Sequence, residues 1–256
     1  MNKFKGIAFN TANLVGQVTN WKFELSHWMD QHHATVKAMD EKRWAEICAK
    51  IAACGYRAVE VWAAHVEPVE RDVAKAMVWK RIMADHGLVP IAYAGGISED
   101  SARVCSWLGI PQTAGGIGGA TLAQVTALCK KHGIKHNHEN HPEKSAQEIL
   151  AKIGGGNECV GVAVDTCWLG TQGVNAPEAI RELGSLVRHV HIKDVKAAGG
   201  HATCMLGEGC VDVAQVLCAL DQTGYTGWLS WEDEPEDRNP FESAVRNREW
   251  LEARIA

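Results

Sequence analysis

One pattern of apolar and polar positions recurs along the chain. An amphipathic stretch is followed by a glycine, two or three residues and a short apolar run, as in AEICAKIAACGYRAVEVW and VTALCKKHGIKHNHENH. A glycine at this place ends a helix in a left-handed conformation, and the apolar run after it is typical of a strand. The glycines concerned are Gly55, Gly87, Gly109, Gly133 and Gly224. The chain is therefore expected to alternate helices and strands.

Polar residues just before the amphipathic stretches predict where the helices begin. In a capping box, the side chains of the cap residue and of a Glu or Gln three residues later each bond the other's backbone N–H. Such pairs stand at Thr121/Gln124, Ser145/Glu148, Asp212/Gln215 and Asn239/Glu242. Pro240 is expected at the first position of the last helix, and Asp40 is expected to cap the first long helix.

Eight apolar runs have the length and spacing of strands. Their bounds are roughly 5–11, 58–63, 89–94, 110–114, 134–139, 160–165, 187–192 and 227–232. Strands that alternate with helices of about ten to fifteen residues are typical of βα units and a parallel sheet. Eight such units predict an α/β protein of one domain, a closed (β/α)8 barrel or TIM barrel over residues 1–256.

Two further features bear on this fold. A doubly wound open sheet is the alternative, but the first strand is not followed by a GxGxxG turn. The run from Val15 to Met39 is too long for a plain connection, so it is interpreted as a cover over the active site or an extra helix. No linker or second domain stands out in the sequence.

Composition and charge disfavour several classes of partner. Hydrophobic residues make up 46% of the chain and charged residues 22%, as in an ordinary globular protein. A net charge of −5 gives no electrostatic basis for binding nucleic acid or a membrane surface. No apolar run reaches the ~20 residues of a membrane span, and Asn10, Thr11 and Asn13 interrupt any signal-like start. Nine cysteines without a CxxC pair favour a cytoplasmic protein.

Four strands end on a residue that can bind a metal. Side chains alternate along a strand, so the outward valines of VGVAVDTCW turn the aspartate after them into the barrel. The same alternation turns His136 and His138 toward the helices. The four inward residues at the strand ends are Glu139, Asp165, His191 and Glu232. All four are expected to converge at the mouth of the barrel, where parallel α/β folds keep their chemistry.

Three carboxylates and one imidazole form an oxygen-rich set of ligands. Such a set favours Mn²⁺, with Mg²⁺, Co²⁺ or Zn²⁺ as alternatives, over the sulfur-rich site of structural zinc. Without a cation, the crowded groups would repel one another or lose solvation. For each residue taken alone, a solvated loop acid or a buried structural histidine is the alternative interpretation.

Other residues near the strand ends are candidate substrate contacts. Trp62 and Asn10 are expected to face the barrel mouth, and His65 and His141 lie just past their strands. Each histidine could contact substrate hydroxyls, act as an acid or base, or lie at the surface. Glu60 also faces inward and needs a buried partner, for which a nearby Lys or Arg and the substrate are equal alternatives.

The segments GIKHNHENH, VAVDTCW, HVHIKD followed by LGEGCVD, and GWLSWEDEP carry a family resemblance. With a weaker likeness at CGYRAVEVW, the chain resembles the xylose isomerase-like barrel superfamily, in its sugar isomerase/epimerase branch. In that family the equivalents of four residues bind a divalent metal, often manganese: Glu139, Asp165, His191 and Glu232. The resemblance also implies a small carbohydrate substrate and, by analogy, a homo-oligomer such as a dimer or tetramer.

The resemblance implies chemistry next to a carbonyl group. A ketose or keto-sugar held by the metal loses a proton from the neighbouring carbon, which gives a metal-stabilised enediolate. Glu139 and Glu232 would exchange that proton on opposite sides of the substrate while also serving as ligands. Lys193 would hold a hydroxyl or stabilise the oxyanion. The function predicted first is therefore a metal-dependent sugar isomerase or epimerase.

Two positions depart from the ketose 3-epimerases of that family. Trp168 stands where they carry a histidine, and their substrate-binding arginine has no match near Ala197. Trp168 offers a flat apolar face for a sugar ring or aglycone, which favours the alternative: a lyase or dehydratase that eliminates a β-leaving group from a 3-keto-glycoside or inosose.

Further alternatives are weaker. Trp168 and the acidic charge disfavour a DNA-repair endonuclease, since that branch needs an additional histidine there and a positive surface. The presence of both Glu139 and Glu232 disfavours a non-catalytic sugar-binding protein. No phosphate-binding glycine loop is evident, so an unphosphorylated substrate is expected. The sequence leaves the identity of the sugar open.

Overall fold

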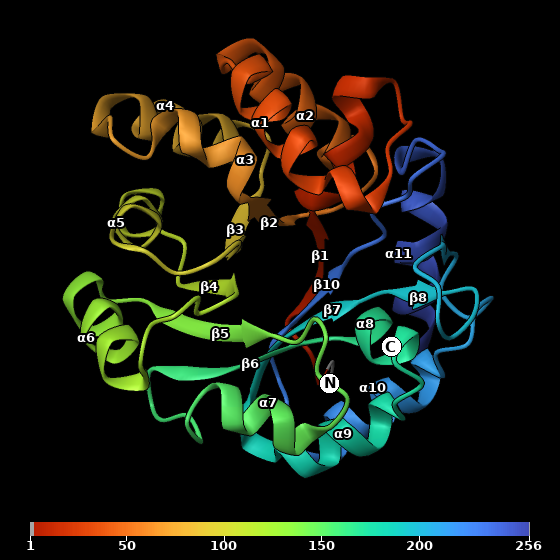
Figure 1. Cartoon of the computed structure of the whole chain (residues 1–256). Coiled ribbons are helices and arrows are strands. Elements are labelled where there is room, and N and C mark those ends of the chain that lie inside the picture. Colours follow the sequence, from red (N-terminus) through yellow and green to blue (C-terminus); the bar gives the residue numbers. More distant parts are fainter. Residues whose placement is uncertain (1–2, 256) are drawn as a thin grey trace.

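Eight parallel strands close into a barrel, and helices surround it (Figure 1). The computed structural model describes residues 3–255. Around the barrel the order is β1–β10–β7–β6–β5–β4–β3–β2, so the first strand pairs with the last. The barrel strands are β1 (Gly6–Asn10), β2 (Ala58–Trp62), β3 (Val89–Ala94), β4 (Gln112–Gly115), β5 (Lys135–Glu139), β6 (Val160–Asp165), β7 (Val187–Ile192) and β10 (Trp228–Trp231). The predicted (β/α)8 barrel is confirmed.

Helices connect the strands and cover the outside of the barrel (Figure 1). The longer ones are α1 (Trp28–Ala38), α2 (Glu41–Ala53), α4 (Val73–Asp85), α5 (Glu99–Leu108), α6 (Leu122–His132), α7 (Ala146–Lys152), α9 (Ala176–Leu183), α10 (Val213–Gln222) and α11 (Phe241–Ile255). The 3-10 helices and the remaining short α-helices are η1 (Thr11–Thr19), η2 (Leu25–His27), α3 (Ala63–Val66), η3 (Glu67–Val69), α8 (Thr166–Thr171) and η4 (Gly184–Leu186). After β7, the chain forms a small antiparallel pair, β8 (Asp194–Val195) with β9 (Thr203–Cys204).

The cap residues act largely as the sequence predicts. Asp40 accepts a hydrogen bond from Arg43 N–H at the start of α2, and both bonds of the Thr121/Gln124 box are present at α6. Gly133 ends α6 in the left-handed conformation. The start of the last helix differs by one residue: α11 begins at Phe241, so the expected helical position of Pro240 is wrong.

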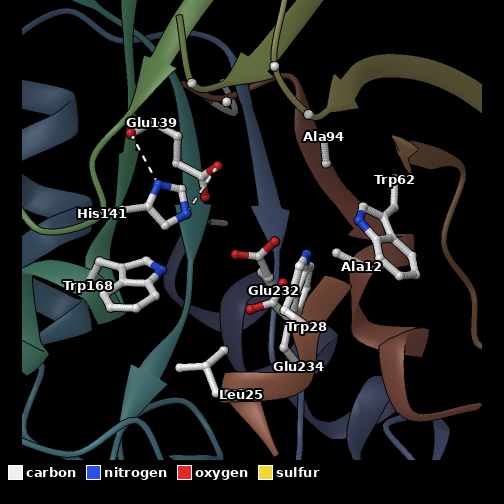
Figure 2. Close-up of a pocket in the computed structure, with 14 residues that line it drawn as sticks. Ala12, Leu25, Trp28, Trp62, Ala94, Glu139, His141, Trp168, Glu232 and Glu234 are labelled. Carbon is white, nitrogen blue, oxygen red and sulfur yellow. Dashed lines mark hydrogen bonds and ion pairs between the residues drawn. The ribbon is translucent and has the colours of Figure 1, made fainter. Parts of the chain in front are cut away.

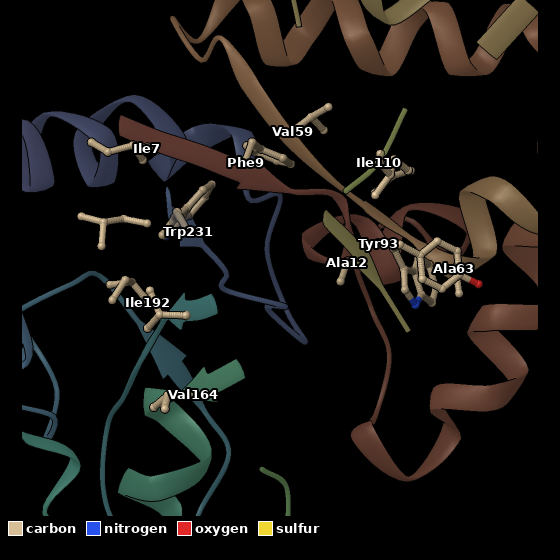
Figure 3. Close-up of a cluster of buried hydrophobic side chains, with 14 of the residues drawn as sticks. Ile7, Phe9, Ala12, Val59, Ala63, Tyr93, Ile110, Val164, Ile192 and Trp231 are labelled. Carbon is tan, nitrogen blue, oxygen red and sulfur yellow. The ribbon is translucent and has the colours of Figure 1, made fainter. Parts of the chain in front are cut away.

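The main apolar core lies between the strands and the helices. Phe9, Val59, Val164, Ile192 and Trp231 point outward from their strands into this layer (Figure 3). A smaller apolar cluster of Ala8, Ala58, Ile91 and Ala92 packs separately, with Trp228 against it. On β1 and β2 a polar side chain follows two residues later on the same face of the strand, Asn10 after Ala8 and Glu60 after Ala58.

The segment between Val15 and Met39 does form additional structure over the barrel mouth. It contains the end of η1, then η2 and α1, and it brings Leu25 and Trp28 to the main pocket. The expected extra helix is therefore present, and the segment also borders the pocket; that it covers an active site stays a prediction. Within residues 3–255, no helix combines the length and the apolar character needed to cross a membrane.

Candidate active site

Four strands bring together the residues that the sequence places at their carboxyl ends. Glu139 and Asp165 are the last residues of β5 and β6, His191 lies near the end of β7, and Glu232 directly follows β10. One ligand atom from each of the four lies within 4.8 Å of the others. This group is called the quartet below. In the barrel register, Asp165 is the neighbour of His191, which explains why distant sequence segments meet.

Each member of the quartet is held by its surroundings. His191 Nδ1 lies 2.8 Å from Glu139 Oε1 and 3.4 Å from Glu232 Oε2. Asn10 Nδ2 donates to Glu232 Oε1 over 2.6 Å. Asp165 Oδ1 accepts from Trp168 N–H over 2.9 Å, which caps α8. The quartet is thus ordered by hydrogen bonds from β1, β5, β7 and α8.

The quartet fits a divalent cation. The second carboxylate oxygen of Asp165, Oδ2, is buried and has no hydrogen-bond partner among the described residues. A buried charged oxygen without a partner is costly, and a bound cation would satisfy it. Three carboxylates with one imidazole supply the hard oxygen and nitrogen donors that such ions take in proteins. The donor set is compatible with several ions and does not identify one.

Charge is concentrated in the quartet. Burial, together with the neighbouring carboxylate of Glu234, raises the pKa of Glu232 well above its ordinary value. Burial acts in the same direction on Glu139, but the imidazoles of His141 and His191 outweigh it and lower the pKa of Glu139 to about 2. Burial disfavours charge on His191, yet the surrounding carboxylates raise the pKa of this imidazole well above its usual range. The site therefore favours positive charge at its centre.

A cavity of about 380 Å³ opens beside the quartet (Figure 2). Trp28 and Trp62 border one side, and His141 and Trp168 border the other. The lining residues are Ala12, Leu25, Trp28, Trp62, Ala94, Gly95, Gly96, Gly115, Gly116, Glu139, His141, Trp168, Glu232 and Glu234. No lysine or arginine is among them, so the pocket offers aromatic faces and carboxylates but no fixed cation for a phosphate.

Two glycine pairs form part of the pocket wall. Gly95–Gly96 follows β3, whereas Gly115–Gly116 begins with the last residue of β4. A Cβ added at Gly115 would lie 2.4 Å from the carbonyl carbon of Gly95. Gly95 N–H also donates to Ala114 O over 2.6 Å. The two chain segments can approach this closely only because side chains are absent.

The predicted substrate contacts fall into two groups. Trp62, His141 and Trp168 line the pocket, and the rings of His141 and Trp168 are 5.2 Å apart between centroids. Asn10 lies behind Glu232 and His65 is fully buried against Thr11 Oγ1 at 2.9 Å, so the structure places neither at the pocket surface.

Lys193 is fully buried rather than exposed in the pocket. Its ammonium pairs with Glu234 and lies 3.7 Å from Glu232 Oε2. Burial disfavours its charge, but the carboxylates of Glu234 and Glu232 raise the pKa of this lysine well above its ordinary value. Lys193 is therefore a charged group at the back of the site. It does not line the pocket itself, but its ion-pair partner Glu234 does.

Several lining residues are absent from the sequence predictions. Leu25, Trp28 and Glu234 are among them, as are both glycine pairs. The triplet Ala-Gly-Gly, repeated at the ends of two successive strands, is a signal that could have found the glycines. Glu60 was expected to pair with a lysine, an arginine or the substrate, and this is wrong: its carboxylate bonds two imidazoles, His189 and His191.

Comparison with protein families finds one that matches more than half of the chain. The model of the xylose isomerase-like TIM barrel matches residues 119–254. The chain belongs to the xylose isomerase-like TIM barrel family. The matched region contains all four quartet residues.

Individual similar proteins are more distant. An inosose dehydratase of Clostridium beijerinckii is 26% identical over 153 residues, which are 51% of this chain and 51% of that protein. The chain thus spans about half the length of the curated relatives that it matches.

Solved structures share the fold over almost the full chain. A structure of L-ribulose 3-epimerase has a TM-score of 0.71 at 17% identity, over 97% of this chain and 94% of that one. The IOLI protein, crystallised with a zinc atom, has a TM-score of 0.65 at 16% identity, over 98% and 97%. At these identities, the likeness concerns the barrel alone.

Proposed function

We propose that this protein is a metal-dependent enzyme that removes a proton next to the carbonyl of a neutral keto-sugar or keto-polyol and then eliminates a β-leaving group. The observation that carries the proposal is the position of Glu139 and Glu232, which share the quartet and also border the cavity. Two carboxylates beside a cation site supply both the proton transfer and the charge stabilisation that such chemistry requires.

Individual residues of the site have separate roles in the proposed reaction. Glu139, held by His191, accepts the proton from the carbon next to the carbonyl. The electron pair left on that carbon forms the new C=C bond as the β-substituent departs, and the substituent takes up a proton from Glu232 or His141. A bound divalent cation would polarise the carbonyl and stabilise the negative charge that develops on its oxygen. Asn10 keeps Glu232 oriented toward the cavity by its hydrogen bond.

Two observations support a neutral substrate with a flat face. The cavity lining contains three carboxylates and no lysine or arginine, which disfavours a phosphorylated sugar. Aromatic rings from Trp62 and Trp168 stand on different sides of the cavity (Figure 2) and suit the apolar face of a sugar ring or an aglycone. Both observations support an inosose or a 3-keto-glycoside as the substrate class.

Elimination is placed ahead of isomerisation, which reverses the order that the sequence predicts. The reason is that the curated relatives, 26% identical in the example above, are named inosose dehydratases. Trp168 in place of a histidine supports the same order. Isomerisation or epimerisation is the second candidate, because the same two carboxylates could remove and return the proton on different faces. The zinc atom in the IOLI structure supports a cation in this barrel, with Mn²⁺ proposed for this chain.

One experiment separates the two reactions. Protein loaded with Mn²⁺ is incubated in heavy water with an inosose, a 3-keto-glycoside and a set of free ketoses, and products are followed by NMR and mass spectrometry. Loss of water or aglycone is expected for the first two substrates. Deuterium next to the carbonyl in an otherwise intact or epimerised sugar would favour the second candidate. Neither change on any substrate would contradict the proposed function. Glu139→Gln is the matched control, and it is expected to abolish product formation.

A further inference from the structure

A second group of polar side chains lies fully buried below the quartet. Glu60 on β2 accepts from two rings of β7: His189 Nε2 is 2.7 Å from Glu60 Oε2, and His191 Nε2 is 3.0 Å from Glu60 Oε1. All three residues are 0% exposed. Strands β1 and β10 stand between β2 and β7 in the barrel order, so these contacts cross the barrel interior.

The hydrogen bonds around Glu60 allow one consistent direction. A carboxylate can only accept, so both Nε2 atoms must carry a hydrogen. The Nδ1 of His189 is then an acceptor, and Gln112 Nε2 lies 3.2 Å from it. Gln112 Oε1 in turn accepts from Asn137 Nδ2 over 2.9 Å. The donors along this chain therefore all point toward Glu60.

This direction determines which nitrogen of His191 is available to the quartet. His191 Nδ1 lies 2.8 Å from Glu139 and 3.4 Å from Glu232, so without a cation the ring carries a hydrogen on this nitrogen as well. A cation that takes the place of this hydrogen finds the lone pair on Nδ1, because Glu60 keeps the other hydrogen on Nε2. We propose that Glu60 is a positioning residue that fixes this tautomer and ring orientation of His191, so that Nδ1 is presented to a divalent cation. His189 holds the other oxygen of Glu60 and fixes the orientation of its carboxylate.

A rival reading of the same residues is a second cation site. Glu60, His189 and His191 also have ligand atoms within 4.8 Å of one another. A cation there would need lone pairs on both Nε2 atoms, and the hydrogen bonds to Glu60 would be lost. With a cation on Nε2, a neutral His191 ring would carry its hydrogen on Nδ1, and that nitrogen could no longer bind a cation in the quartet. The positioning role therefore requires one cation per chain, whereas the rival requires two.

Glu60→Gln tests the role directly. The amide oxygen can accept from one imidazole, but the amide nitrogen must donate to the other, so the two rings can no longer both carry hydrogen on Nε2. Mn²⁺ affinity, measured by calorimetry on metal-free protein, is expected to fall by about 10- to 100-fold, the usual effect of losing a partner behind a metal-binding histidine. Circular dichroism shows whether the variant is folded.

The matched control is Glu67→Gln. Glu67 also bonds an imidazole, with 2.6 Å between its Oε1 and His32 Nε2, but it lies outside the quartet and the cavity that borders it. The same change of carboxylate to amide at this position is expected to leave Mn²⁺ affinity unchanged. An equal loss in both variants would overturn the positioning role, as would wild-type affinity in a folded Glu60→Gln.

The position of the histidine hydrogens can also be measured in the wild-type protein, independently of the folding of any variant. In protein loaded with Zn²⁺, which is diamagnetic, histidine nitrogens labelled with ¹⁵N report which ring atom carries hydrogen. The expected result is hydrogen on Nε2 of both His189 and His191, with one ion per chain. Hydrogen on Nδ1 of His191, or two bound ions, would overturn the proposal. These outcomes do not depend on turnover, so they are separate from any failure of the proposed reaction.

Discussion

The two oxygens of Asp165 have different surroundings, and this separates two functions of one side chain. Oδ1 caps α8 by accepting from Trp168 N–H, whereas Oδ2 is buried and has no hydrogen-bond partner in the described chain. Asparagine keeps an oxygen for the cap and removes the charge. A conservative substitution can therefore test cation binding without disturbing the local fold.

Asp165→Asn is expected to weaken Mn²⁺ binding by at least about tenfold, because a neutral amide is a poorer ligand than a carboxylate for a hard cation. The free energy of unfolding of the metal-free protein should stay within about 1 kcal/mol of wild type, since the cap is retained. Calorimetry and urea denaturation measure the two quantities. Asp212→Asn makes the same change at the cap of α10 and should alter neither. Unchanged Mn²⁺ affinity in Asp165→Asn would remove this residue from the quartet.

The burial of His136 determines how acid affects the free energy of unfolding. It bonds Thr113 Oγ1 on β4 at 2.8 Å, and burial lowers its pKa from 6.5 to about 3. The unfolded chain binds a proton here below about pH 6.5, while the folded chain does not. This contribution to stability is present above pH 6.5 and is lost as the pH falls toward 3.

His136→Gln should therefore make the free energy of unfolding less dependent on pH between 6.5 and 4, by up to about 1.4 kcal/mol per pH unit. Urea denaturation at a series of pH values measures the slope. His33→Gln, at an exposed position of α1, serves as the control and should leave the slope unchanged. An identical slope in His136→Gln and wild type would show that this imidazole does not resist protonation in the folded state.

At the scale of elements, β3 and β4 end in the same way. A glycine pair stands at the carboxyl end of each strand, and the two pairs touch because neither carries a side chain. Gly115→Ala would place a Cβ 2.4 Å from backbone atoms of Gly95, which cannot move as a flexible side chain does. Because the backbones must separate, the variant should lose about 1–3 kcal/mol of unfolding free energy, measured by urea denaturation. Gly119→Ala, with open space around its Cβ, should lose much less.

The sequence predicts elements well where a side-chain period exists. Alternation along β6 is sufficient to turn Asp165 inward, and the glycines after helices locate most strand starts. The pair β8–β9 leaves no such signal, because each strand has two residues. The partners of Glu60 are equally hidden, since they lie more than 120 residues away across the barrel. Glu234, which follows β10, lines the pocket and has a backbone φ of 50°. A glutamate in the sequence does not predict this conformation.

At the scale of the whole molecule, a cation held by four strands should stabilise the closed barrel. β5, β6, β7 and the end of β10 each supply one quartet residue. A ligand that binds only the folded chain at 100 times its Kd adds about 2.7 kcal/mol. Saturating Mn²⁺ should therefore raise the Tm by roughly 5 to 10 °C in a chain of this size.

Differential scanning calorimetry with and without Mn²⁺ measures this shift. The double variant Glu139→Gln with His191→Ala should show no shift, because two of the four ligands are gone. Full metal occupancy in that variant, or an equal Tm shift, would contradict the quartet as the binding site.

The pairing of β1 with β10 also sets the order in which a growing chain can complete itself. β1 is synthesised first, yet one of its edges has no neighbour until Trp228–Trp231 has been made. Asn10 meets its partner Glu232 only after 222 further residues. A nascent chain therefore carries an open, partly built sheet that lacks its last cation ligand, and such an edge is prone to pair with other chains. Cation uptake by the complete quartet can follow only when β10 has closed the ring.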